Sequence, residues 1–257
     1  MSRVKATTCA IAVMAKAPQP GRCKTRLLPL LTPQQAAALS AAFLRDITEN
    51  IATAGSRMPI DGYIAYAPLG LEALFDDHIA DGTGLVLADG SPDMPGNIEG
   101  FGRCLLHAIQ SLLASGYDSA CVLNSDSPTL PTSILARTAR LLALPGDRAV
   151  LGPADDGGYY LLGLKAPHAH LFEDIAWSTG SVAERTALRA REIGLELVTL
   201  PTWYDVDEAA SLYRLIDSLD ETVFPNDADL TPFAAPATAA YLEQLGLSRY
   251  TPTKMTA

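Results

Sequence analysis

TCAIAVMAKAPQPGRCKTR, residues 8–26, points most directly to a fold class. Its first eight residues, 8–15, form an unbroken apolar run, which is typical of a parallel strand covered by helices on both faces. A loop rich in proline and glycine follows and carries the cations Lys16, Lys24 and Arg26. A strand ending in such a loop is typical of an α/β fold with a ligand site at the carboxyl edge of its sheet.

Downstream of this loop, helix and strand patterns alternate along the chain. Thr32, Pro33 and Gln35 match a capping box with proline at the first helical position, and apolar residues then recur at steps of four up to Gly55. The pattern predicts further strands at 63–67, 85–88, 119–123, 149–152, 159–164 and 196–200, and further helices at 100–114, 132–142, 182–193 and 208–219.

This alternation predicts a single Rossmann-like α/β domain, with a mostly parallel sheet sandwiched by helices. No long linker divides the chain, so we expect the domain to span residues 1–219. Residues 220–257 are richer in proline and alanine and less periodic. We expect them to form a C-terminal extension, packed on the domain or trailing from it, with a short helix at 238–245.

Composition and charge exclude several functional classes. A net charge of -10 over 257 residues argues against a nucleic-acid binder, which needs a basic face. The apolar run at 8–15 is too short to cross a membrane, and residues 1–5 are too short to precede the apolar region of a secretory signal. The four cysteines contain no C-x-x-C pair, which favours reduced thiols and a cytoplasmic protein. Nothing in the sequence indicates the oligomeric state.

The loop after the first strand is the first candidate site. Lys16, Lys24 and Arg26 can bind phosphate oxygens, and Gly21 permits close approach of the backbone. GRCKT resembles the end of a P-loop, but the first glycine of that motif is absent, which argues against a Walker A site. A solvated basic loop is the alternative interpretation.

Two acidic segments are candidates for a metal site. Asp126 follows the buried strand at 119–123, where a carboxylate can bind Mg²⁺ or Mn²⁺ together with substrate phosphates. Asp205 and Asp207 point the same way if their segment is extended, so one of them can join Asp126. Helix capping by Asp126 or Ser127, and by Asp207, is the competing interpretation.

The turn at 154–158 and a later tryptophan are candidates for binding the acceptor or the sugar. Asp155 or Asp156 can bind a hydroxyl or act as a base, and Gly157 and Gly158 open the backbone around them. An ordinary Asp-Gly hairpin turn explains part of this pattern. Trp177 can stack on a base or a sugar, or can be a partly buried core residue.

Several segments together resemble one known family: AKAPQPGRCKTRL, SDSPTLP, GPADDGGYYLLGL, WST and DVD, in this order. The chain resembles, over about residues 8–219, a bacterial family of GT-A-fold proteins that are nucleotide-diphospho-sugar transferase-like and include the arsenosugar-biosynthesis glycosyltransferases. It is more distantly similar to the 2-phospho-lactate guanylyltransferases and the molybdenum-cofactor guanylyltransferase. The resemblance implies a GT-A fold.

The resemblance also implies roles for individual residues. Lys16, Lys24 and Arg26 would contact the nucleotide phosphates, Asp126 and Asp207 would bind the metal, and the turn at 155–158 would face the acceptor. Transfer of a sugar from a nucleotide-diphosphate donor to a small acceptor is then the leading hypothesis, with Asp126 and Asp156 as catalytic residues. Nucleotidyl transfer with release of pyrophosphate, and a nucleotide-binding module without turnover, are the alternatives.

Overall fold

The computed structural model describes residues 8–220 and 230–247. Its strands are β1 Cys9–Ala15, β2 Ile60–Tyr66, β3 Gly84–Leu87, β4 Ser119–Leu123, β5 Arg148–Pro153, β6 Tyr159–Leu164 and β7 Glu196–Thr199. Its α-helices are α1 Pro33–Gly55, α2 Phe101–Ala114, α3 Thr132–Ala143, α4 Val182–Glu192, α5 Ala209–Asp220 and α6 Pro236–Gln244. Four short 3₁₀ helices occur at η1 Thr25–Leu27, η2 Glu72–Leu74, η3 Asp76–His78 and η4 Ala169–Phe172.

The strands form one seven-stranded sheet in the order β3-β2-β1-β4-β6-β5-β7. Only β6 among these strands runs antiparallel to its neighbours, β4 and β5. The α/β class and the mostly parallel sheet predicted from the sequence are confirmed. Because the loops after β1, β4 and β5 leave the same edge of the sheet, the chain's three distinctive loops lie at one end of the molecule.

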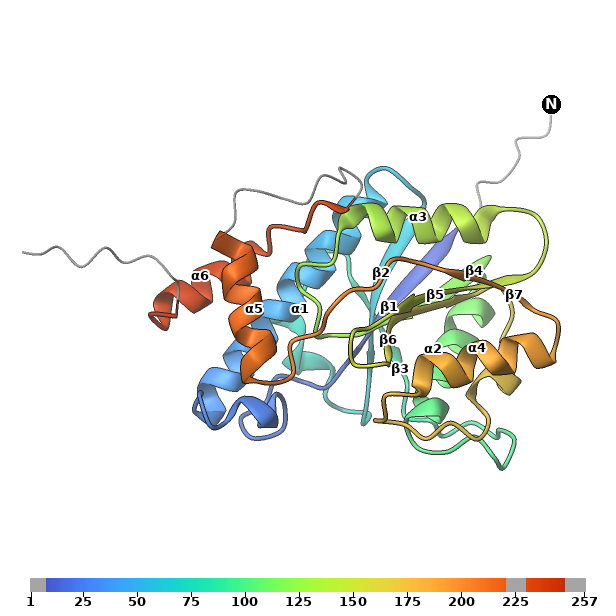
Figure 1. The fold of residues 1–257 in the computed structure, drawn as a ribbon, viewed down its shortest axis with the longest axis horizontal. Helices are drawn as coiled ribbons and strands as arrows, with labels where there is room; N and C mark the ends of the chain where they lie inside the picture. The colour runs from blue at the N-terminus through green and yellow to red at the C-terminus, as the bar shows by residue number, and fades with distance from the viewer. Residues whose placement is uncertain (1–7, 221–229, 248–257) are drawn as a thin grey trace, which may run out of the picture.

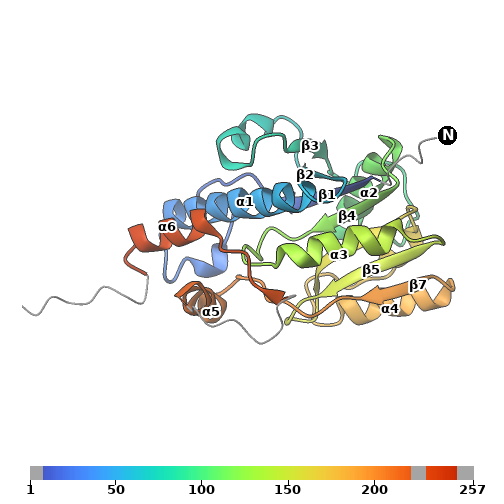
Figure 2. The same cartoon turned by 90° about the horizontal axis from the view of Figure 1, so that it is seen from above.

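Helices cover both faces of the sheet (Figures 1 and 2). Helices α1 and α3 pack on one face, joined by α5 and α6, and α2 and α4 pack on the other. The apolar run of β1 serves both layers, because Ile11 and Val13 belong to the first core while Ala10 and Ala12 belong to the second. This double burial explains why the strand is apolar at every position.

The first helix is set by the capping box that the sequence predicts. Thr32 Oγ1 accepts a hydrogen bond from the backbone N–H of Gln35, and the Gln35 side chain accepts one from the N–H of Thr32. The apolar side chains spaced four apart along α1 are all buried in the core: Leu39, Phe43, Ile47 and Ile51.

Two element boundaries differ by more than one residue from those expected. Strand β2 begins three residues earlier, at Ile60, because it pairs with β1 from Cys9 onward, and the sheet holds the polar Asp61 within the strand. Helix α6 begins at Pro236, because proline fits the first helical turn, where an N–H has no intrahelical partner.

The C-terminal residues that the structure describes pack on α1. The buried carboxylate of Asp46 in α1 accepts hydrogen bonds from the N–H groups of Ala237 and Thr238, at 2.9 and 2.7 Å. This contact satisfies backbone donors at the start of α6, which have no partner within the helix. Burial raises the pKa of Asp46 above its usual value. Residues 221–229 and 248–257, which belong to the expected extension, lie outside the described part of the chain.

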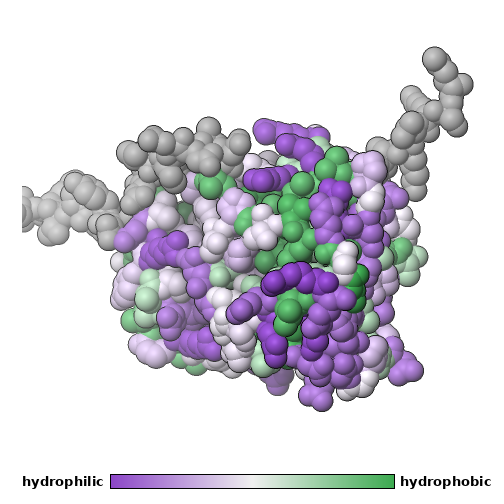
Figure 3. All heavy atoms as spheres, turned by 45° about the vertical axis from the view of Figure 1, so that its right-hand side comes forward, coloured by the Kyte–Doolittle hydropathy of each residue, from purple (hydrophilic) through white to green (hydrophobic). Residues whose placement is uncertain are grey.

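No helix in the described part of the chain is both long and apolar enough to cross a membrane. Hydrophobic side chains do gather on the side of the molecule that carries α4 and β7, between hydrophilic ones (Figure 3). Leu144 and Ile193, just beyond the ends of α3 and α4, are among the exposed large hydrophobic residues.

Candidate active site

A cavity of about 440 Å³ opens at the carboxyl ends of β1, β2 and β4. The loop after β1 forms one wall, and the ends of β2 and β4 and the start of α2 form the others. The lining includes cations, carboxylates and apolar groups: Lys16, Arg22, Lys24, Arg26, Tyr66, Phe101, Cys104, Ser125, Asp126 and Asp207. One half of the cavity is therefore charged and the other half, around Tyr66 and Phe101, is largely apolar.

Lys24 lies at the centre of the charged half. Its Nζ is 2.6 Å from Asp126 Oδ1 and 3.4 Å from Asp207 Oδ1, and it donates a hydrogen bond to the carbonyl of Val206 at 2.5 Å. The ammonium also lies 5.1 Å from the centre of the Phe43 ring. Only 5% of the side chain is exposed. The lysine thus links the first loop to the two acidic segments.

The other cations of the loop are more open to solvent. Arg26 is 70% exposed and lies 3.7 Å from Asp207 Oδ2. Lys16 and Arg22 are exposed and have no ion-pair partner among residues 8–220 and 230–247. Arg22 also lines the cavity, although it was not predicted as a site residue of this loop.

Gly21 occupies a tight turn next to the cavity. The N–H of Arg22 donates to the carbonyl of Gln19 at 3.0 Å, and Gly21 has a φ of 74°. Pro20 followed by a glycine with positive φ is the pattern of a type II turn. Gly21 is not among the residues that line the cavity, so its visible role is to turn the loop.

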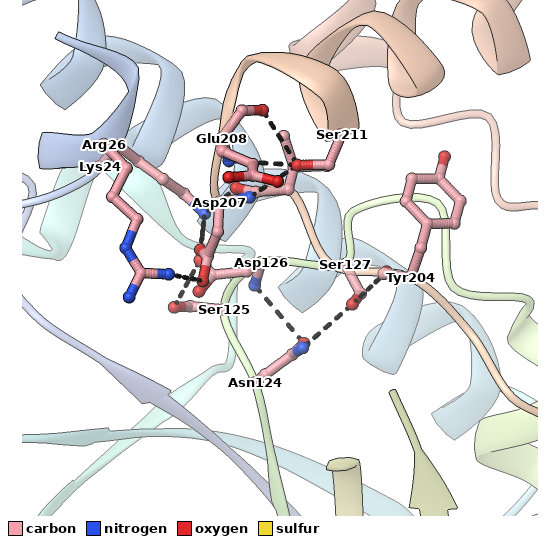
Figure 4. Close-up of polar contacts among 11 residues, drawn as sticks. Lys24, Arg26, Asn124, Ser125, Asp126, Ser127, Tyr204, Asp207, Glu208 and Ser211 are labelled. Carbon is pink, nitrogen blue, oxygen red and sulfur yellow. Dashed lines mark hydrogen bonds and ion pairs between the residues drawn. The ribbon is translucent and has the colours of Figure 1, made fainter. Parts of the chain in front are cut away.

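Asp126 and Asp207 come from distant segments that hydrogen bonds join into one unit (Figure 4). The N–H of Val206 donates to the carbonyl of Asp126 at 2.9 Å. The hydroxyl of Ser127 donates to the carbonyl of Tyr204 at 2.8 Å and lies 3.1 Å from the Asn124 amide nitrogen. Both carboxylates face Lys24, and the N-cap residue of α3 is Pro131, with no side-chain cap bond. Neither Asp126 nor Ser127 therefore caps α3.

Burial and neighbouring negative charge raise the pKa values of Asp207 and Asp205. Burial raises the pKa of Asp207, the charge of Asp126 raises it further, and Lys24 opposes both effects. Burial, together with the charges of Asp156, Asp207 and Asp126, raises the pKa of Asp205 to about 6. Such an accumulation of negative charge favours a bound cation.

The donor set fits a hard divalent cation. Two carboxylates converge on a position that an ammonium already holds, and oxygen ligands shared with substrate phosphates are what Mg²⁺ and Mn²⁺ prefer. Within the described residues, no group of three or more His, Cys, Asp or Glu side chains is arranged to hold a metal alone. The protein would thus supply part of the coordination and the ligand would supply the rest.

The turn after β5 lies at the same edge of the sheet but outside the cavity lining. Asp155 pairs with Arg214 of α5, and Asp156 Oδ1 accepts a hydrogen bond from the N–H of Gly158 at 2.8 Å. Gly157 has a φ of 86°, and a Cβ there would lie 2.0 Å from the carbonyl oxygen of Gly180. The turn therefore docks on the loop that follows Trp177.

Trp177 does not line the cavity itself but packs against a residue that does. Its ring meets that of Phe101 edge to face at 5.9 Å, and Phe101 lines the cavity. Gly102 leaves the space that the indole fills, because a Cβ there would lie 2.7 Å from the Trp177 ring. Tyr66, Phe101 and Cys104 were not predicted as site residues, since apolar residues near strand and helix ends carry no sequence signal that separates a cavity wall from the core.

Known structures share this fold. A candidate nucleotide-diphospho-sugar transferase from Desulfovibrio desulfuricans G20 is 27% identical, with a TM-score of 0.75, covering 93% of this chain and 96% of that one. A nucleotidyl transferase from Methanothermobacter thermautotroptrophicus is 16% identical, with a TM-score of 0.51, covering 82% of this chain and 96% of that one. A CMP:2-keto-3-deoxy-manno-octonic acid synthetase complexed with CTP is 11% identical, with a TM-score of 0.50, covering 81% of this chain and 97% of that one.

No curated protein sequence matches the chain. One family model does, over residues 50–179, which is half of the chain, and its description is "Uncharacterized protein conserved in bacteria (DUF2064)". The region matched includes the segment with Asp126, the turn at 155–158 and Trp177. The chain belongs to this DUF2064 family of bacterial proteins.

Proposed function

We propose that this protein is a nucleotide-dependent transferase that moves a sugar from a nucleotide-diphosphate donor to a small acceptor. The observation that carries the proposal is the pairing, in one cavity, of four cations from the first loop with the carboxylates of Asp126 and Asp207. The likeness to the candidate nucleotide-diphospho-sugar transferase supports it.

The charged half of the cavity suits a diphosphate. Lys16 and Arg22 are free to bind phosphate oxygens, and an arginine can donate two parallel hydrogen bonds to such a group. The apolar half, around Tyr66 and Phe101, suits the flat ring of a base. A nucleoside diphosphate has both chemical features, one at each end.

Asp126 and Asp207 would hold a divalent cation, Mg²⁺ or Mn²⁺, with the diphosphate. When bound, such an ion neutralises negative charge that builds on the diphosphate leaving group. Arg26 would act in the same direction from the mouth of the cavity, where it already lies near Asp207.

The turn at 155–158 would face the acceptor. We assign Asp156 as the group that takes a proton from an acceptor hydroxyl, with Asp155, Gly157, Gly158 and Trp177 shaping that side of the site. Asp156 suits this task because it is exposed and its charge acts on Asp205, beside the carboxylate pair.

Product analysis distinguishes this proposal from nucleotidyl transfer. The protein is incubated with Mn²⁺ and a panel of nucleotide-diphosphate sugars, and separately with nucleoside triphosphates and phosphorylated acceptors. We expect slow, Mn²⁺-dependent release of nucleoside diphosphate from at least one sugar donor, and loss of that release in Asp126→Asn. Release of pyrophosphate from a triphosphate, with no release from any sugar donor, would replace sugar transfer by nucleotidyl transfer.

A further inference from the structure

The Lys24 ammonium holds the position between the two carboxylates. It lies 2.6 Å from Asp126 Oδ1 and 3.4 Å from Asp207 Oδ1 (Figure 4). The same carboxylates are the ones that would bind a divalent cation in the proposed function. One ammonium therefore occupies the place where the oxygens of both segments converge.

The ammonium is fully engaged there. It donates hydrogen bonds to the carbonyl of Val206 and to Asp207, and it forms an ion pair with Asp126. Its side chain is 5% exposed and crosses the face of the Phe43 ring. A lysine so placed is held by two carboxylates and a carbonyl, although it stands in the basic loop.

We infer that Lys24 and a divalent cation compete for Asp126 and Asp207, so that the lysine must leave before the metal can bind. This inference rests on the proposed function, because it takes the same carboxylates as the metal site. Two cations cannot share one pair of carboxylates at contact distance without strong repulsion.

An anion in the cavity gives the displaced ammonium a new partner. Lys24 stands in the same loop as Lys16 and Arg22, and all three line the cavity. A bound phosphate that accepts hydrogen bonds from Lys24 frees both carboxylates, and by linkage a bound metal strengthens phosphate binding equally. Metal alone then binds weakly, and nucleotide and metal bind together.

The first test compares Mn²⁺ affinity, without nucleotide, in the wild type, Lys24→Met and Lys165→Met. Lys165 is a matched control, since its ammonium bonds the carbonyls of Leu144 and Gly146 outside the cavity. Electron paramagnetic resonance of free Mn²⁺ reports binding directly. We expect Lys24→Met to bind Mn²⁺ about tenfold more tightly than the wild type, because a charge-assisted contact no longer competes. Lys165→Met should match the wild type.

The second test uses the unaltered protein, so it does not depend on how a variant folds. Lysine acetylation with acetic anhydride is read by mass spectrometry with and without Mn²⁺. Because the Lys24 side chain is 5% exposed and its ammonium contacts two carboxylates, it should react slowly, and saturating Mn²⁺ should raise its acetylation severalfold. Lys165 should not change.

Each outcome bears on the inference. Tighter Mn²⁺ binding by Lys24→Met, together with faster acetylation of Lys24 in the wild type, supports displacement. Equal affinity in both proteins, or acetylation of Lys24 that Mn²⁺ leaves unchanged, overturns displacement and leaves the proposed function standing. Absence of Mn²⁺ binding in both proteins, with UDP or GDP present as well as without, overturns the inference together with the metal site of the proposed function.

Discussion

Ser127 shows how single residues hold the site without facing it. Its side chain is buried, and its hydroxyl connects the Asn124 amide to the carbonyl of Tyr204. The Tyr204 hydroxyl in turn lies 3.0 Å from Thr129 Oγ1 and 2.9 Å from Ser218 Oγ in α5. Buried polar networks of this kind are stabilising only when every member is paired. The spacing of Asp126 and Asp207 therefore depends on residues that do not line the cavity.

Gly157→Ala tests the docking of the turn at 155–158. The new Cβ would lie 2.0 Å from the Gly180 carbonyl oxygen, and the φ of 86° is already unfavourable for alanine. Gly116→Ala is the control, because Gly116 has a φ of 97° with nothing within 4 Å of its Cβ position. Urea unfolding should show a loss of about 1 kcal/mol for Gly116→Ala. Gly157→Ala should lose clearly more, roughly 3 kcal/mol. Equal losses of unfolding free energy in the two variants would mean that the turn can shift away from Gly180 without cost.

Residue types at the site were predictable, but their partners were not. The sequence placed Lys24 in a basic loop and Asp126 after a buried strand, because both stand next to strong strand and turn signals. The Lys24–Asp126 contact joins segments 102 positions apart and depends on the strand order, which periodicity does not encode. The lysine therefore looked like a free phosphate ligand, whereas the structure shows it bound to carboxylates.

At the scale of elements, the strands were predictable because their burial requires a recognisable pattern of apolar residues in the sequence. Strand β4 is buried at all five positions, so it reads as a short continuous apolar run. The reversal of β6 also follows from the chain, since a connection as short as 154–158 joins only antiparallel strands. The start of β2 was missed because Asp61 lies within the strand, and tertiary pairing overrides its low strand propensity.

The contact between η4 and α4 predicts a pH dependence of stability. His170 lies 2.7 Å from Glu192 and 2.6 Å from Glu173, and these contacts, that with Glu192 foremost, raise its pKa. A raised pKa means that the folded protein holds the proton more tightly than the unfolded chain does. The stabilisation is therefore complete below the unfolded pKa of about 6.5 and is lost as the pH rises through the folded pKa.

We accordingly expect His170→Gln to lower the free energy of unfolding more at pH 6 than at pH 9. Urea unfolding of both proteins at the two pH values measures this difference. The contributions of the ionisable groups that both proteins share cancel when the wild type and the variant are compared. A loss of the same size at both pH values would show that protonated His170 contributes no more than the neutral ring.

At the scale of the whole molecule, several cations gather at one site although the chain as a whole is acidic. The chain carries a net charge of -10, yet Lys16, Arg22, Lys24 and Arg26 all line one cavity. An acidic surface disfavours polyanions such as nucleic acids, while a local group of cations can still bind a small phosphorylated ligand. The fold itself does not choose the reaction, because transferases of different chemistry share it. That choice belongs to the cavity and to the turn at 155–158, which we propose faces the acceptor.

The measurement that bears most directly on the central claim is thermal unfolding with UDP or GDP, in the presence and absence of Mn²⁺. The proteins to compare are the wild type, Asp126→Asn and, as a control, Asp174→Asn. The native Asp174 carboxylate pairs with Arg189 outside the cavity. A ligand that binds the folded state raises the melting temperature according to its concentration and affinity. We predict a rise that Mn²⁺ enlarges in the wild type and in Asp174→Asn, with no enlargement in Asp126→Asn. No rise with either nucleotide, or an Mn²⁺ effect that Asp126→Asn retains, would contradict a nucleotide and metal site in this cavity.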